Sequence, residues 1–146
     1  MILDQVVTSE LTSAPDAAYH EKCMEIINFT TDCDNQEVII SVIIPFSGHV
    51  TQLPASSNAL RVYLDGDAYY NYSYASYWNG ELLLNSGTFT PPVANHPIVS
   101  VLSGVIRKTI AKAGPHTINV QSAGGTVSTV TTIKSQRRYQ VWECQQ

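Results

Sequence analysis

The last third of the chain alternates polar and apolar residues in short segments, which predicts β-strands. Ile118 and Val120 lie on one face of such a segment, and the polar residues between them face the other side. Ala123-Gly124-Gly125 supplies residues that tolerate positive φ, as a tight hairpin needs. The pattern predicts a terminal meander of three strands: His116–Ser122, Thr126–Ile133 and Arg137–Cys144.

The most apolar run of the chain is Glu37–Phe46, and its β-branched residues predict a central core strand with Pro45 near its end. Ser47–Asn58, with its glycine, proline and serines, is expected to form a loop. Asp65-Gly66 predicts a two-residue hairpin, and Gly104 a bulge. Alternation or β-branched composition predicts further strands at Met24–Thr30, Ala59–Leu64, Asp67–Tyr77, Glu81–Leu84 and Ile98–Ile110.

These segments add up to about eight or nine strands with short turns and no amphipathic helix. A sheet with one apolar face must cover that face, so we predict an all-β fold, a two-sheet β-sandwich of jelly-roll or tumour-necrosis-factor-like topology. Residues 1–20 are expected to form an N-terminal arm or a first edge strand. Residues 21–146 are expected to form a single β-sandwich domain.

The composition adds a low charge to this picture. Of the 146 residues, 14% are charged, against about 25% in an average soluble domain. This suits strand faces that carry hydroxyls and amides, and it equally suits a surface buried against other subunits. The net charge of −4 makes nucleic acid an unexpected partner. Arg137-Arg138, with Lys134 nearby, reads as solubilising charge at a strand entrance.

The sequence gives no sign of a membrane segment or of disulfide chemistry. No stretch reaches the roughly 18 continuous apolar residues of a membrane helix. The first residues lack the basic region of a signal peptide, so we expect synthesis in a cytoplasm. Cys23, Cys33 and Cys144 are then free thiols by default, although a Cys23–Cys33 bridge stays open.

Several motifs resemble the C-termini of tailed-bacteriophage virion proteins. The sequence reads A-G-P-H-T-I-N-V-Q from Ala113, then G-G-T-V from Gly124, then R-R-Y-Q-V-W-E from Arg137. Upstream, V-V-T-S-E-L from Val6 is similar to the usual opening of these proteins, and L-R-V-Y-L-D-G from Leu60 to their hairpin. Three residues depart from the pattern: Pro115, Tyr139 and Trp142.

The resemblance implies a jelly-roll or tumour-necrosis-factor-like sandwich that forms a homotrimer in a virion. Its partners would be other virion proteins, either the major capsid protein or a fibre or tail protein. No fibre repeat or coiled-coil heptad accompanies the domain, which favours a capsid decoration or head-appendage protein. The alternative is a receptor-binding tip module of a tail or head fibre that recognises a host-surface glycan.

An aromatic cluster is the candidate binding or interface site: Tyr69, Tyr70, Tyr72, Tyr74, Tyr77 and Trp78. In an unbroken strand, Tyr70, Tyr72 and Tyr74 share one face. Tyrosine anchors protein interfaces and aromatic faces stack on sugars. Cross-strand packing inside a sheet is the plainer explanation of the same cluster. Packing, a subunit contact and a glycan site are therefore three readings of it.

Candidate chemistry is sparse elsewhere. Asp32, Asp34 and Asn35 bring oxygen ligands together, as do Asp65 and Asp67, but turn chemistry explains both groups. The four histidines lie far apart with no zinc spacing. No nucleophile elbow, P-loop or dinucleotide fingerprint is present. We therefore expect no metal, no cofactor and no enzymatic activity.

Overall fold

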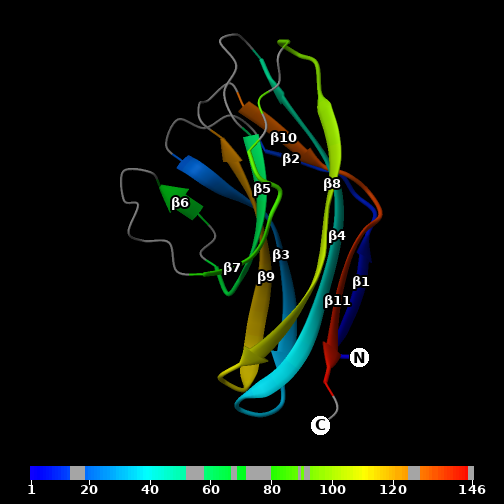
Figure 1. Ribbon diagram of the computed structural model, residues 1–146, viewed down its shortest axis with the longest axis vertical. Helices are drawn as coiled ribbons and strands as arrows, with labels where there is room; N and C mark the ends of the chain where they lie inside the picture. The colour runs from blue at the N-terminus through cyan, green and yellow to red at the C-terminus, as the bar shows by residue number, and fades with distance from the viewer. Residues whose placement is uncertain are drawn as a thin grey trace.

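The computed structural model describes residues 1–13, 19–51, 58–66, 69–71, 80–88, 90, 93–124 and 129–144. This part of the chain forms an all-β sandwich of two antiparallel sheets, which confirms the predicted fold class (Figure 1). It contains eleven strands, more than the eight or nine expected: β1 (Leu3–Val7), β2 (Leu11–Ser13), β3 (Tyr19–Thr31), β4 (Gln36–Val50), β5 (Asn58–Leu64), β6 (Tyr69–Asn71), β7 (Glu81–Asn85), β8 (Ile98–Ile110), β9 (Gly114–Gly124), β10 (Thr129–Ile133) and β11 (Arg137–Glu143). None of the described segments is a helix long and apolar enough to cross a membrane.

The six-stranded sheet is organised around β4. Along one edge, Gln36–Gly48 of β4 pair with the whole length of β8. Along its other edge it pairs first with β11 and then with β10, which are flanked by β1 and β2 respectively. The second sheet has five strands in the order β6-β3-β9-β5-β7. Figure 1 shows β4 and β8 side by side along the length of the molecule, with β3, β9 and β5 in the facing layer.

The sequence pattern of β4 explains its central position. Its even-numbered residues, from Gln36 to Val50, are all buried against the facing sheet. Its odd-numbered residues point to the outside of the six-stranded sheet. Glu37 and Ile39 are partly exposed and Ile43 is exposed, whereas the small Ser41 and Ser47 are buried. An unbroken row of buried even-numbered residues is the signature of a strand with one face in the core.

The core lies between the two sheets and takes residues from both. Ile40, Val42 and Ile44 of β4 face Ile118 and Val120 of β9 across it, and all five are fully buried. The burial of Ile118 and Val120 agrees with the face predicted from their alternation. At about 25 cal/mol per Å² of apolar surface, burial of such side chains is the main force that holds the sheets together.

Pro45 is not near the end of its strand, as was expected, because β4 continues to Val50 through the first part of the predicted loop. The proline is tolerated at a gap in the pairing. β11 pairs with β4 as far as Ile43 and β10 pairs from Phe46, so neither strand lies opposite Pro45. Its carbonyl still accepts a hydrogen bond from Lys134 N at 2.8 Å. The missing N–H of a proline costs little stability where no neighbouring strand has a carbonyl to accept its hydrogen bond.

The predicted terminal meander is wrong in its pairing. β9 belongs to the five-stranded sheet, between β3 and β5, whereas β10 and β11 belong to the other sheet. β10 and β11 each pair with β4 and not with one another. Gly125 of the predicted turn and residues 126–128 of the strand predicted after it lie outside the described part of the chain.

Asp65-Gly66 does not form the predicted two-residue hairpin either. β5 pairs with β9 and β7, and β6 pairs with β3 at the far edge of the same sheet. Asp65 does adopt a left-handed conformation, with φ of 54°, but its side chain serves another contact described below. A turn-forming dipeptide predicts that the chain changes direction. It does not determine which strand the preceding one pairs with.

Gly104 is not at a bulge, because the β4–β8 register runs without a shift from Gln36 to Gly48. The glycine has a packing reason instead. A Cβ at this position would overlap Leu84 Cδ2 of β7. Gly104 therefore lets the edge of the five-stranded sheet approach the inner side of β8, where Glu81 of β7 also pairs with Lys108.

Candidate interaction surface

The predicted aromatic site lies mostly outside the described residues. Tyr72, Tyr74, Tyr77 and Trp78 are in this undescribed part, and of Tyr69 and Tyr70 only the backbone is described. That backbone forms β6, in which Tyr70 pairs with Glu21 and Tyr69 with Lys22 of β3. The cluster therefore stays a prediction.

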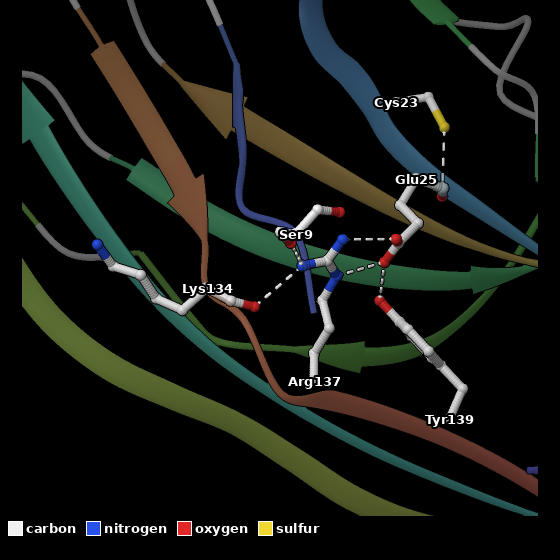
Figure 2. Close-up of polar contacts among 6 residues, drawn as sticks. All are labelled: Ser9, Cys23, Glu25, Lys134, Arg137 and Tyr139. Carbon is white, nitrogen blue, oxygen red and sulfur yellow. Dashed lines mark hydrogen bonds and ion pairs between the residues drawn. The ribbon is translucent and has the colours of Figure 1, made fainter. Parts of the chain in front are cut away.

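A buried polar cluster joins the two sheets (Figure 2). Arg137 on β11 shares its face with the buried Tyr139 and Val141, and Glu25 on β3 shares its face with Ile27 and Phe29. Both side chains consequently point between the sheets. Arg137 Nε and Nη2 donate to the two carboxylate oxygens of Glu25, each at 2.6 Å.

The remaining donor of Arg137 is also satisfied. Nη1 donates to the carbonyl of Ser9 and, at 3.0 Å, to that of Lys134. Tyr139 Oη donates to Glu25 Oε2 at 2.5 Å. The Arg137 side chain has no exposed surface, and that of Glu25 is 9% exposed. The prediction of solubilising charge is thus wrong for Arg137. It fits Lys134 and Arg138, whose side chains are partly exposed and pair with Glu10 and Asp4.

Electrostatics make this cluster structural and not catalytic. Burial alone would lower the pKa of Arg137, but the hydrogen bonds and charge of Glu25 outweigh it and raise that pKa, so the guanidinium stays charged. Burial, together with the nearby carboxylate of Glu25, raises the pKa of Tyr139 far above its ordinary value, so the phenol stays neutral and donates. Neither group can transfer a proton near neutral pH.

The three cysteines form no disulfide in the structure. Cys23, Cys33 and Cys144 are free thiols, and the bridge left open between Cys23 and Cys33 does not form. Burial raises the pKa of Cys23, whose Sγ lies 3.6 Å from the carbonyl oxygen of Glu25. A thiol of raised pKa is a poor nucleophile. Among the described residues no group of three histidines, cysteines or carboxylates is placed to hold a metal ion.

The outer face of the six-stranded sheet is the feature with functional potential. Val99, Val101 and Val105 on β8 point away from the core and are 74%, 56% and 71% exposed. On the neighbouring strand β4, Ile43 is 44% exposed and Pro45 half-buried. We call these five residues the valine face. An apolar cluster on two adjacent strands is typical of a contact surface, whereas single exposed apolar residues need no explanation.

The register of β4 with β8 makes the valine face continuous. Val101 lies opposite Pro45, and Ser103, between the valines on β8, lies opposite Ile43. Val99 and Val105 lie opposite two small serines of β4, Ser47 and Ser41. The residues that lie between the apolar ones on this face are thus small and carry hydroxyl groups.

Charge on this side of the sheet is neutralised within the chain. On the outward positions of β1, β4, β8 and β11 the charged residues form two pairs. Arg107 donates to Glu37 at 2.8 Å, and Arg138 makes a two-pronged contact with Asp4 at 2.9 and 3.0 Å. The two pairs leave this side of the sheet without net charge, beside an apolar centre.

One backbone edge of β8 is also unpaired among the described residues. Among the described residues its thirteen-residue ladder has one partner strand, β4, and its second edge faces no other strand. Long, flat, apolar edge strands are the sites at which sheets add further strands or stick to other chains. The sequence carried a signal for this surface, since residues 98–106 are apolar on both faces of the strand, as in strands covered on both sides.

Comparisons with known proteins support no functional assignment. No protein-family model matches this chain, and neither does any curated protein. Among solved structures, the sugar-binding EclA C-terminal domain is 13% identical, with a TM-score of 0.46 over 97% of this chain and 83% of that chain. An aminopeptidase from a marine sediment Thaumarchaeota archaeon has a TM-score of 0.38 at 6% identity, over 94% of this chain and 33% of that one.

Infectious bursal disease virus, Gt strain, is also similar in part, with a TM-score of 0.25 at 9% identity over 96% of this chain and 40% of that one. At such low scores and identities these likenesses carry no argument about function. The assignment of a β-sandwich rests on the strand pairing of this chain itself.

Proposed function

We propose that this chain is a structural, self-associating β-sandwich, whose valine face is the contact between copies. The observation that carries the proposal is the exposure of Val99, Val101 and Val105 on one strand, next to Ile43. Complete burial of a valine side chain is worth about 1.5–3 kcal/mol, so covering three of them supplies much of the free energy of a specific contact.

The charges on this side of the sheet favour a second copy of the chain as the occupant. A surface that binds a charged partner is expected to carry unpaired charges of the opposite sign. On this face Arg107 and Arg138 are already paired with Glu37 and Asp4. Two copies of a neutral apolar face do not repel one another, even though the whole chain carries −4. A glycan needs many hydrogen-bonding groups at its site, which this face does not offer.

The resemblance to tailed-bacteriophage virion proteins gives the proposal its biological setting. In a virion, three copies of the chain would pack their valine faces around a common axis, and the homotrimer would bind the major capsid protein or a head appendage. The role is mechanical and involves no catalysis. The alternative, a fibre-tip module that recognises a host-surface glycan, rests on the aromatic cluster of residues 69–78.

Sedimentation of the purified chain over a range of concentrations tests the contact. We expect an oligomer, with three copies as the expected number. The double variant Val101→Glu/Val105→Glu removes two apolar contacts and buries two charges, so association should weaken by at least about 100-fold. Leu82→Glu is the matched control, because Leu82 is 48% exposed on the opposite sheet.

A wild-type chain that sediments as a monomer at high micromolar concentration would contradict the proposal. So would a double variant that associates as strongly as the Leu82→Glu control. The number of copies per purified particle then separates the two virion roles. Hundreds of copies indicate decoration of the capsid, whereas a few trimers indicate a fibre tip.

A further inference from the structure

His116 occupies a position that the interface does not explain. It lies at the start of β9, where the β8–β9 turn comes close to the end of β5. Its Nδ1 is 2.8 Å from Asp65 Oδ2, and its Nε2 is 2.7 Å from the carbonyl oxygen of Lys112. The side chain is 11% exposed, and its ring packs against Phe29 with a centroid separation of 5.7 Å.

Both partners of the imidazole are acceptors. A carboxylate and a backbone carbonyl have lone pairs and no proton to give. A neutral imidazole carries one N–H, so it could satisfy only one of the two contacts. The imidazolium carries an N–H on each nitrogen and satisfies both. The geometry therefore selects the protonated ring.

We propose that His116 is a protonation-dependent latch, which ties the turn after β5 to the β8–β9 turn when its ring is charged. Loss of the proton breaks one of its two hydrogen bonds and leaves an unpaired nitrogen facing an acceptor. The inference is independent of self-association, because the latch lies in contacts between β5, β3 and the β8–β9 turn, away from the valine face.

Asp65 makes hydrogen bonds to both His116 and Thr117. Its second carboxylate oxygen, Oδ1, accepts a hydrogen bond from Thr117 N at 2.8 Å, and its own N–H donates to Thr117 O at 2.9 Å. These contacts stabilise the left-handed conformation of Asp65, which only a few residue types adopt. Next to it, Asn119 Nδ2 donates to the carbonyl of Gly66 at 2.9 Å. The turn after β5 is thus held through β9.

The other end of the latch is equally well anchored. The carbonyl of Lys112 also accepts from Thr31 Oγ1 at 3.2 Å, so it uses both lone pairs. Asp34 Oδ1 accepts from Ala113 N at 2.9 Å and fixes the same turn from the β3–β4 side. His116 therefore connects two turns that are each held in place by other hydrogen bonds.

The charged groups around the ring favour protonation. Asp65 faces it from the end of β5, Asp34 lies on the β3–β4 turn, and Lys112 lies on the β8–β9 turn; β3 contributes the uncharged Phe29 ring. Burial alone would lower the pKa of His116. The hydrogen bonds to Asp65 and to the Lys112 carbonyl, with the charge of Asp65, outweigh burial and raise that pKa above its ordinary 6.5.

The direction of the pH effect follows from this sign. A histidine whose pKa is higher in the folded state binds its proton more tightly there than in the unfolded chain. The latch therefore contributes its full stability below the unfolded value of 6.5, and the contribution is lost as the pH rises through the folded pKa.

A titration of the histidine side chains by ¹H–¹⁵N NMR tests the latch directly. In the native chain at pH 6 both ring nitrogens of His116 should show the signature of an imidazolium, and its pKa should exceed that of the same residue in the urea-unfolded chain. Asp65→Asn keeps an oxygen for Thr117 N but removes the carboxylate charge, so it should lower the pKa of His116.

Hydrogen exchange gives the second readout. After correction for intrinsic rates, protection of the Thr117 amide should fall about tenfold as the pH rises through the native pKa, since a hydrogen bond to a charged group is lost. His116→Gln should abolish this pH dependence. His96→Gln, on an exposed loop, is the matched control and should retain it.

A His116 pKa at or below its unfolded value would overturn the proposal. A single neutral tautomer in the native chain at pH 6, or a pH-independent protection of Thr117 in wild type, would do the same. Each of these measurements uses the wild-type chain, so the test survives even if a variant does not fold.

Discussion

The two sides of the six-stranded sheet reverse the usual distribution of charge and apolar surface. On the inner side, Arg137 is completely buried, whereas on the outer side Val99 is about three-quarters exposed. The buried charge is satisfied because all three guanidinium nitrogens donate hydrogen bonds, to Glu25 or to two backbone carbonyls. The exposed valines have no such partner within the described chain. The contrast teaches that complementary contacts, and not residue type alone, decide what a sheet can bury.

Removing the buried charge should have the largest effect. Arg137→Met leaves the Glu25 carboxylate between the sheets without its main donor, so we expect unfolding free energy to fall by about 3–5 kcal/mol. Urea unfolding measures the change. Arg138→Met, the neighbouring arginine on the solvent side, is the control and should leave the midpoint almost unchanged.

The double variant Arg137→Met/Glu25→Gln sharpens this result. It removes both charges, so it should recover part of the loss seen in Arg137→Met. If Arg137→Met were as stable as wild type, the cluster would not hold the sheets together, and the contrast between the two sides of the sheet would fail.

The inner side of β8 gives an effect of intermediate size. Gly104→Ala places a methyl group against Leu84 Cδ2 and should cost about 1–3 kcal/mol in unfolding free energy. Adding Leu84→Ala makes room for that methyl group. The double variant should therefore lose less stability than the sum of the two single changes. Strict additivity would show that the two residues are not in contact.

The outer side of the same strand should give the smallest effect on folding. Val99→Thr/Val101→Thr/Val105→Thr keeps the β-branched shape and changes only exposed methyl groups, so each substitution should change the stability of the dissociated chain by less than about 0.5 kcal/mol. Association should weaken clearly at the same time. A large loss of monomer stability would mean that these valines belong to the core and not to an interface.

Local sequence patterns were sufficient to predict most strands and, in β9, the face that is buried. The apolar, β-branched composition of Glu37–Phe46 placed it at the centre, and alternation put Ile118 and Val120 on one face; both predictions are confirmed. It did not predict partners. The pattern of a strand fixes its two faces, but the choice of neighbour depends on contacts between residues far apart in the chain, such as β9 with β3.

The burial of Arg137 could have been inferred from alternation. In the segment from Arg137 to Glu143, Arg137 shares its parity with Tyr139 and Val141, so one of the two adjacent arginines had to face inward. What the sequence could not provide was the partner, because Glu25 lies in a strand 112 positions away. The latch at His116 was equally hidden, since Asp65 and His116 meet only in the fold.

The central position of β4 has a consequence for how the protein is made. β4 is complete at Val50, but its three neighbours begin at Ile98, Thr129 and Arg137. At about 5–20 residues per second, a ribosome needs roughly 5–20 s to synthesise the residues between Val50 and the end of β11. Until β8 has been made, the most apolar strand of the chain has none of its ladder partners, and until β11 is complete it lacks part of the second edge of its ladder. The nascent chain therefore exposes an apolar strand with unpaired edges during synthesis, and such a strand favours aggregation; we expect co-expressed chaperones to raise the soluble yield.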